Sequence, residues 1–250
     1  SNLGAEYDKK YIKTIAGIVY PFDRYASLGL YFSYKDNKET YERPYEGFYQ
    51  KKRGVIASYM VNKLNGLYLS AVYGYYANLV AGYYDHMAGG NVRYNSFSAD
   101  YTRYLPLSRK SAVVNRFLSG FSTGKDNPEF SYGGVGGIRG FIDNSSNESR
   151  NVLVYNAEAR ICLFNMDYYM GYFFPDFYFK AIYFKLFSDN AYGWNSSFSP
   201  SVGDIKNSVG FGFNLHSFVL QRYQMVISFD WSFNTKTGAR VMYFYLGPVF

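Results

Sequence analysis

The chain has 250 residues, of which 48% are hydrophobic and 22% aromatic, with 30 Tyr and 23 Phe. This length allows one large all-β domain or two small ones, and a soluble core would usually contain more Leu and Ile and fewer Tyr. The net charge of +7 comes from Lys and Arg in expected loops and strand ends, without a basic helix or run, so we expect no nucleic-acid partner.

Apolar and polar residues alternate along most of the chain. In residues 25–35 the apolar positions are Ala26, Leu28, Leu30 and Phe32. In residues 151–164 one face is apolar, and the other carries Asn156, Glu158 and Arg160. Long strands with one apolar and one polar face are typical of a transmembrane β-barrel. A large β-sandwich also alternates, but it would seldom place paired charges in mid-strand opposite a face this aromatic. We therefore expect an all-β transmembrane antiparallel β-barrel.

The alternation predicts strands at residues 11–20, 25–35, 53–63, 67–84, 92–104, 111–122, 151–164, 177–192, 207–215, 223–233 and 240–250. Residues 64–84 are uncharged and long enough for a membrane helix. They contain Asn65-Gly66, a strong hairpin signal, so we interpret them as a turn and a strand. Because bacterial barrels have even strand numbers, we expect about 12 strands. Residues 2–7 would supply the extra one, with a turn at 8–10. The alternative is that an N-terminal strand or domain has been lost.

Short and long connections alternate between the expected strands. We place the short ones, near 21–24, 65–66, 105–110 and 216–222, in the periplasm, together with a somewhat longer one near 165–176. The longer ones, 36–52, 85–91, 122–150 and 190–207, lie outside in this assignment, with a tight turn at 234–239. The longest contains the glycine-rich run Tyr132-Gly-Gly-Val-Gly-Gly-Ile-Arg-Gly-Phe141.

Five motifs follow one another in the second half of the chain. Residues 134–141 are a close version of G-G-x-x-[VI]-R-G-[FY]. They are followed by Asn156-Ala-Glu158-Ala-Arg160, Phe187-Ser-Asp189, Ser208-Val-Gly-Phe-Gly212 and Ile227-Ser-Phe-Asp230. In this order, residues 110–250 resemble the BamA/TamA/FhaC superfamily of outer-membrane assembly and two-partner-secretion translocators, also called the bacterial surface antigen family. The first half matches only generically.

The resemblance implies that the long extracellular loop folds into the barrel lumen. The docked motif would be Gly136, Gly137, Ile138, Arg139, Gly140 and Phe141, and its docking partners would be Glu158, Phe187 and Asp189. Chemistry agrees, because a buried arginine needs a carboxylate partner and glycines allow close backbone approach. The alternative is an exposed loop arginine, with Glu158 and Arg160 satisfied locally.

Residues 242–250 alternate apolar side chains and end in phenylalanine, similar to the insertion signal of the family. Phe244, Leu246 and Phe250 would carry that signal, and the barrel-assembly machinery would read it. The chain starts without a basic and then apolar leader, so we expect a mature form or a fragment. We expect a single transmembrane domain over residues 1–250, lacking the family's N-terminal periplasmic domains, in the bacterial outer membrane.

The resemblance implies a non-enzymatic protein insertion or translocation factor whose first and last strands meet at a seam that opens sideways. Unfolded outer-membrane or secreted client proteins would be its partners, with outer-membrane lipid and lipopolysaccharide around it. Two alternatives stay open. One is a barrel that anchors or exports a fused passenger such as a patatin-like lipase, and the other is a small diffusion pore.

Few residues suggest catalysis. Gly120-Phe-Ser122-Thr-Gly124 matches G-x-S-x-G, but a nucleophile elbow needs a strand-to-helix turn. In the expected topology His86 lies outside and His216 in the periplasm, so neither serves Ser122. The glycine run lacks the complete G-x-G-x-x-G pattern. Cys162 is the only cysteine, so no intrachain disulfide is possible. We expect no catalytic residues, no cofactor and no metal.

Overall fold

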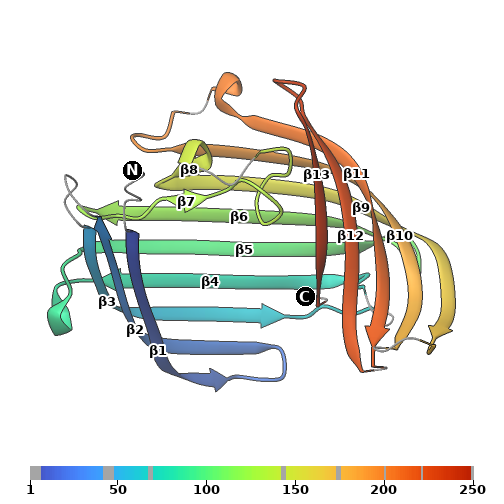
Figure 1. Ribbon diagram of the computed structural model, residues 1–250, viewed down its shortest axis with the longest axis horizontal. Helices are drawn as coiled ribbons and strands as arrows, with labels where there is room; N and C mark the ends of the chain where they lie inside the picture. Colours follow the sequence, from blue (N-terminus) through green and yellow to red (C-terminus); the bar gives the residue numbers. More distant parts are fainter. Residues whose placement is uncertain are drawn as a thin grey trace, which may run out of the picture. The chain divides into compact units, whose positions relative to one another are not determined.

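The computed structural model describes residues 7–41, 48–66, 70–141, 145–172, 176–199, 201–220 and 222–248. Within these ranges the secondary structure is almost entirely β (Figure 1). Eleven strands form one sheet in the order β1-β2-β3-β4-β5-β6-β9-β10-β11-β12-β13, and β7 pairs with β8 in a sheet of two strands. Apart from β7 and β8, each strand therefore lies beside its neighbour in the chain, which is the topology of an up-and-down meander.

The strands are long. Their bounds are β1 Tyr7–Pro21, β2 Ala26–Tyr41, β3 Phe48–Asn62, β4 Gly74–Tyr84, β5 Tyr94–Pro106, β6 Ala112–Gly124, β7 Phe130–Ser131, β8 Glu148–Ser149, β9 Asn151–Met170, β10 Phe177–Trp194, β11 Lys206–Val219, β12 Tyr223–Asn234 and β13 Arg240–Pro248. Three short 3-10 helices, η1 Met87–Gly89, η2 Ser145–Asn147 and η3 Val202–Asp204, lie in the connections. None of the helices in the described residues is long and apolar enough to span a membrane.

The chain divides into two compact units. Unit 1 contains Ser1–Val61, Asn78–Ala99 and Gly120–Glu129, and unit 2 contains Asn62–Ala77, Asp100–Ser119 and Phe130–Phe250. In unit 1, β1, β2 and β3 pair antiparallel in unbroken register, from Tyr7↔Tyr41 to Pro21↔Ser27 and from Ala26↔Val61 onward. The apolar face of β2 is exposed, with Leu30 at 50%, whereas Ser33 on the other face is buried.

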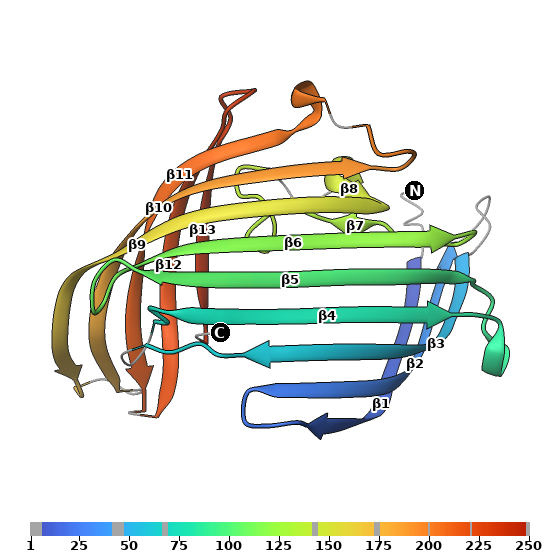
Figure 2. The ribbon, with the colours of Figure 1, turned by 180° about the vertical axis from the view of Figure 1, so that it is seen from behind.

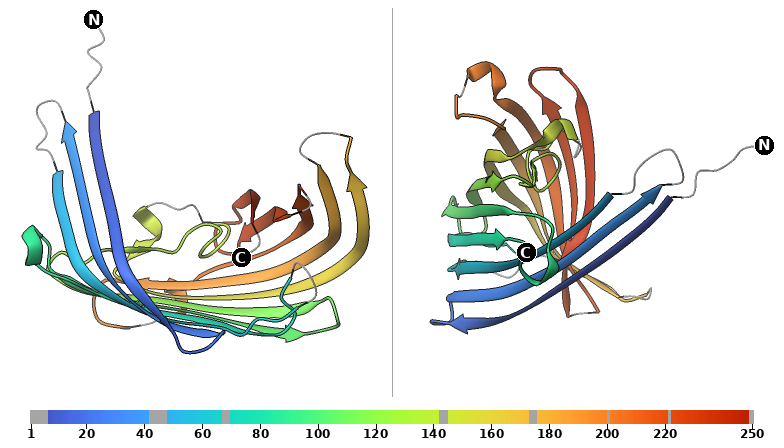
Figure 3. Two further views of the ribbon diagram at one scale, coloured as in Figure 1. Left: turned by 90° about the horizontal axis from the view of Figure 1, so that it is seen from below. Right: turned by 90° about the vertical axis from the view of Figure 1, so that its left-hand side faces the viewer.

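Unit 2 contains the antiparallel ladder β9 to β13, whose strands run side by side in Figure 2. Its two faces differ sharply. The face that carries Leu186, Phe213, Phe229 and Phe244 is exposed, whereas Glu158, Lys185, Asp189, Ser208 and Asp230 on the other face are buried. The segment from β7 to Phe141 lies on this polar face, as Figure 3 shows. Unit 2 therefore buries its polar face and exposes its apolar one.

Each of the eleven strands predicted from residues 11–250 has a counterpart, but their ends differ. The turn predicted at residues 8–10 is wrong, because these residues belong to β1 and pair with Lys38, Glu39 and Thr40 of β2. The predicted strand 2–7 lies outside the described residues, apart from Tyr7, which begins β1. The described residues near the start of the chain thus belong to one long strand, β1, and not to a short strand and a turn.

Three loops were also predicted with wrong bounds. The turn at Asn65-Gly66 is part of a longer connection, closed by an Asn65↔Tyr73 bridge, so β4 starts at Gly74 rather than residue 67. The predicted loops 36–52 and 165–176 are shorter than expected, because β2, β3 and β9 extend into them. Polar residues at strand ends do not stop a ladder whose neighbouring strand continues to offer hydrogen-bond partners.

Candidate functional site

The loop between β6 and β9 has a compact backbone. β7 and β8 close its base through the pairs Phe130↔Ser149 and Ser131↔Glu148. Above them, Ile138 N donates to the Tyr132 carbonyl at 2.8 Å, and Gly134 N donates to the Phe141 carbonyl, also at 2.8 Å. The predicted motif therefore forms a tight turn whose own hydrogen bonds fix its shape.

Two of the motif glycines occupy positions that a side chain would not fit. Gly140 has φ +87°, in the left-handed region, and a Cβ there would lie 2.8 Å from Ser232 Oγ and 3.2 Å from Ser208 Cβ. A Cβ on Gly137 would overlap with the Tyr132 carbonyl, whereas one on Gly136 would meet nothing within 4 Å. Of the three predicted motif glycines, Gly137 and Gly140 thus have a steric role and Gly136 has none.

Ile138 anchors the loop through apolar contacts. Its side chain is fully buried in a cluster with Tyr132, Val152, Val154 and Ala191, and Phe141 packs against the same cluster. Burying such a side chain contributes about 1.5–3 kcal/mol. Ile138 and Phe141 therefore hold the loop against β9 and β10.

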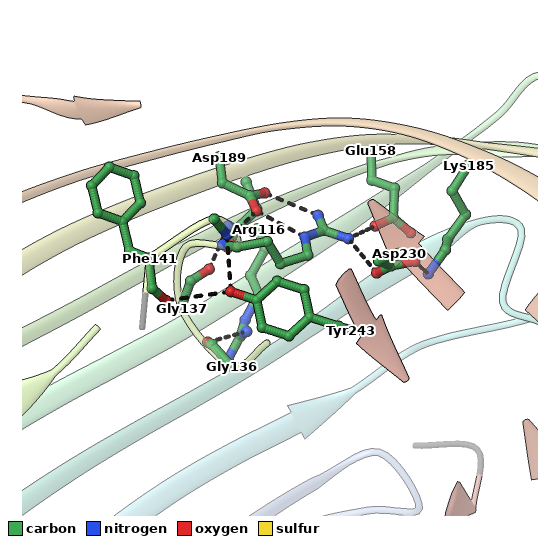
Figure 4. Close-up of polar contacts among 12 residues, drawn as sticks. Arg116, Gly136, Gly137, Phe141, Glu158, Lys185, Asp189, Asp230 and Tyr243 are labelled. Atoms are coloured by element: carbon green, nitrogen blue, oxygen red, sulfur yellow. Dashed lines mark hydrogen bonds and ion pairs between the residues drawn. The ribbon is translucent and has the colours of Figure 1, made fainter. Parts of the chain in front are cut away.

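Arg139 points its guanidinium group into the polar face of the sheet and is only 7% exposed. Its Nε and Nη2 donate to the two carboxylate oxygens of Asp189 at 2.8 and 2.9 Å. Its Nη1 donates to Glu158 at 2.8 Å and to Asp230 at 3.1 Å. The backbone N–H of Arg139 also donates to Asp189 at 3.0 Å. Three carboxylates from β9, β10 and β12 thus surround one cation (Figure 4).

The ring of Phe187 covers the open side of the guanidinium, with Arg139 Cζ 3.4 Å from the ring centroid. Phe187 and Asp189 are two residues apart on β10, so both side chains point to the same face. On the neighbouring strand β11, a Cβ at Gly210 would overlap with the Phe187 ring, and one at Gly212 with the Asp230 carboxylate. The Ser208–Gly212 motif therefore leaves room for Arg139's partners.

Two further cations complete the group of charges. Arg160 pairs with the second oxygen of Glu158 at 2.6 Å, and Lys185 pairs with Asp230 at 2.6 Å. Together with Arg139, these residues balance the three carboxylates of Glu158, Asp189 and Asp230. Burial alone would lower the pKa of Arg139, but its hydrogen bonds to Asp189 and the surrounding carboxylates raise that pKa above its ordinary value. The loop arginine therefore stays charged.

Side chains from three strands also hold the loop backbone, and those of Arg116 and Tyr243 are labelled in Figure 4. Arg116 donates to the Gly136 carbonyl at 2.9 Å, and Asn156 donates to the Gly137 carbonyl at 2.8 Å. The Tyr243 hydroxyl on β13 accepts from Gly140 N at 3.0 Å and donates to the Phe141 carbonyl at 3.3 Å. These bonds satisfy backbone groups that burial would otherwise leave unpaired.

Lys206 at the start of β11 holds the base of the loop. Its ammonium group donates to the Ser146 carbonyl at 2.7 Å, to Asn147 at 2.8 Å and to the Tyr132 hydroxyl at 3.0 Å. A cavity of about 240 Å³ lies at the loop, and its walls include the charged residues Arg139, Glu158, Lys185 and Asp230 together with Arg116 and Tyr245. The loop is therefore held at two places, by Lys206 at its base and by the partners of Arg139 at its tip.

The structure brings Arg139 together with Glu158, Phe187 and Asp189. Glu158 binds Arg139 and Arg160 at once, so the local pair and the docked loop coexist. Asp230, Lys185 and Tyr243 were not among the predicted docking partners of Arg139. Asp230 stood in a quoted motif, and its alternation with Ser228 and Ser232 was the available signal.

Phe244 and Leu246 lie on the exposed face of β13, at 60% and 55% exposure, and Phe250 lies outside the described residues. Ser122 lies within β6 and donates to the Pro128 carbonyl at 2.7 Å, so the G-x-S-x-G sequence is part of a strand and not an elbow. Within the described ranges no group of three or more His, Cys, Asp or Glu side chains could hold a metal ion.

Comparison with protein-family models and with curated proteins gives no match. Among solved structures, the chain is similar to BamA from Haemophilus ducreyi lacking POTRA domains 1–3, with a TM-score of 0.70 and 16% sequence identity. The similarity covers 96% of this chain and 54% of that chain, so the present chain spans about half the length of its solved relative. The protein has the fold of the BamA barrel.

Proposed function

We propose that the protein is an outer-membrane β-barrel of a non-enzymatic protein insertion or translocation factor. The observation that carries this proposal is the docked loop, in which Arg139 binds Asp189, Glu158 and Asp230 across three strands. The fold of the BamA barrel supports it independently. A loop folded into the interior would also leave little open channel for a diffusion pore.

The exposed face of the sheet supports a membrane location. In both units large apolar and aromatic side chains are exposed, among them Ile18, Leu30, Phe229 and Met242. Contiguous apolar surface of this kind is rare on soluble monomers, and it suits lipid. We therefore place the protein in the bacterial outer membrane, with lipid and lipopolysaccharide as its surroundings. Phe244 and Leu246 would be read by the machinery that inserts it.

In the proposed mechanism the loop braces the lumen while the edge strands provide a seam. Among the described residues, β1 and β13 each have one hydrogen-bonded neighbour. β1 has 15 residues and β13 has 9, so β13 is the shorter of the two edge strands. Few ladder bonds would close such a seam. Cysteine pairs placed along β1 and β13 in a Cys162→Ser background test the seam. Disulfide cross-linking of the two strands should block client insertion, and reduction should restore it.

The central test reconstitutes the purified protein into lipid vesicles and measures the folding rate of an unfolded outer-membrane client. We expect wild type to accelerate client folding and Arg139→Ala to lose most of this acceleration. Arg109→Ala, which removes an exposed arginine in a short connection, is the matched control. An unaccelerated client with wild type would contradict the insertion function.

The two alternatives have their own outcomes in these vesicles. Large, steady conductance without client folding would indicate a diffusion pore. Neither conductance nor client folding, together with a passenger domain encoded upstream, would indicate an anchor or export route for that passenger. Client folding that depends on Arg139 would exclude both.

A further inference from the structure

One face of unit 1 carries three lysines at directly opposed positions. Lys13 of β1 pairs in register with Lys35 of β2, and Lys35 pairs with Lys52 of β3. All three side chains therefore point to the same face, in a row that crosses the strands. Like charges opposite one another destabilise a sheet, so this row is costly unless something negative lies near it.

The described residues supply no such partner. None of the three lysines pairs with a carboxylate in that part of the chain. The nearest acidic residue along β2, Asp36, points to the opposite face and is bound by Arg53 at 2.7 Å. Among the side chains that the structure describes, the arginine on one face is thus neutralised, and three ammonium groups lie together on the other.

Tyrosine rings flank the row. The Lys35 ammonium lies 5.1 Å from the centroid of Tyr11, and the Lys52 ammonium lies 5.6 Å from that of Tyr94. Tyr94 stacks on Tyr84 with centroids 4.4 Å apart and an interplanar angle of 19°. Tyrosine offers an apolar ring and a polar hydroxyl together, which suits contact with a polypeptide chain. Tyr94 is buried, at 5% exposure, whereas Tyr11 is 50% exposed. The face therefore combines positive charge with the aromatic surface of Tyr11 and the half-buried Tyr84.

The opposite face argues against a lipid ligand here. The apolar residues that would contact acyl chains, such as Leu30 and Phe32, alternate with Ser33 and Lys35 along β2 and so point away from the lysine row.

The spacing of the lysines suits an extended polypeptide. Neighbouring strands are about 4.8 Å apart, so the row spans roughly 10 Å. Alternate side chains of an extended polypeptide are about 6.7 Å apart, within reach of two or three flexible lysines.

We propose that Lys13, Lys35 and Lys52, with Tyr11 and Tyr84, form a contact surface for extended polypeptide segments that carry acidic side chains at alternate positions. This inference rests on the proposed function and names a class of client segment for it. The ammonium groups bind carboxylates as point charges, and the rings of Tyr11 and Tyr84 contact the residues between them. The bound segment relieves the repulsion within the row.

The test uses the full chain in detergent micelles and a short fluorescein-labelled peptide in which glutamate alternates with serine. A peptide with glutamine in place of glutamate is the ligand control. Binding is followed by fluorescence anisotropy, which requires no client insertion and so separates this inference from the proposed function. We expect binding of the glutamate peptide that weakens as salt is added.

The two variants for comparison remove the same charge from the same three strands. Replacing Lys13, Lys35 and Lys52 by Gln should weaken binding about tenfold, the combined value of three exposed ion pairs. Replacing Lys10, Lys38 and Lys51, which point to the opposite face, should leave binding near that of wild type. Migration before and after boiling in detergent gels checks that both variants are folded.

Three results would overturn the inference. They are equal affinity for the glutamate and glutamine peptides, equal weakening by the two triple variants, and a lysine-row variant that binds the peptide like wild type but binds lipopolysaccharide less. A protein that binds the glutamate peptide through the lysine row yet accelerates no client folding would support this site and contradict the insertion function.

Discussion

At the scale of single residues, Arg139 is a buried charge that the fold compensates nearly completely. Five hydrogen bonds connect it to Asp189, Glu158 and Asp230, and a ring covers its open side. Burying charges is expensive, so such a network contributes less net stability than its bonds suggest. We expect its effect to be specificity, because a shifted register of loop and strands would leave buried charges unpaired.

Asp189 binds Arg139 through both carboxylate oxygens, so its replacement should destabilise the docked loop. Asp189→Ala leaves a buried guanidinium short of one carboxylate, at a cost of about 3–5 kcal/mol. We expect residues 125–150 to become sensitive to protease in the folded protein. Asp204→Ala, which removes an exposed carboxylate, should leave the loop resistant. Unchanged resistance in Asp189→Ala would refute the docked role of the loop.

The motif glycines allow a second prediction, with the adjacent residue as its control. Gly137→Ala should mobilise the loop because its Cβ would overlap with the Tyr132 carbonyl. Gly136→Ala should be tolerated, since a Cβ there meets nothing within 4 Å. Thermal unfolding of the two variants checks this, with a loss of about 1–3 kcal/mol expected for Gly137→Ala only. Equal stability of the two variants would mean that the loop adapts to either methyl group.

At the scale of elements, Tyr243 connects the docked loop to the edge strand β13. Its hydroxyl makes two hydrogen bonds to the loop backbone. Because β13 is otherwise held by β12 alone among the described strands, this contact makes loop docking and ordering of β13 interdependent. A loop that leaves the sheet would release the last strand as well.

Tyr243→Phe tests this connection. It removes both hydrogen bonds, at roughly 0.5–1.5 kcal/mol each, and leaves two buried backbone groups unsatisfied. We expect faster amide hydrogen exchange in β13 and at Gly140. Tyr245→Phe, two residues along the same face, is the control. Exchange that rises at Gly140 while β13 stays protected would show that strand and loop are independent.

The sequence predicted the strands well and their ends poorly. Alternation in residues 151–164 located β9, but the strand continues to Met170 because β10 supplies ladder partners as far as Phe177. Asn65-Gly66 predicted a turn, yet the connection extends to the bridge at Tyr73. Periodicity is a property of each segment, whereas a strand's end depends on its neighbour.

At the scale of the whole molecule, the docked loop should limit passage through the proposed barrel. In planar bilayers we expect wild type to give small, flickering conductance, because the loop and its polar partners fill the interior. Arg139→Ala should give larger openings, because the loop is no longer held. Arg109→Ala should behave as wild type. Large, steady openings in wild type would instead favour the diffusion pore.

The sequence by itself determined the all-β class, the order of the strands and the candidate loop. These properties follow from alternation and short motifs, which are local. Only the tertiary structure decided that Asp230, Lys185 and Tyr243 join the loop, and that three lysines share one face of β1–β3. Arg139 and Asp230 are 91 positions apart in the chain, and Lys13, Lys35 and Lys52 come from three strands. Their meeting depends on the register of the ladders, which no single segment encodes.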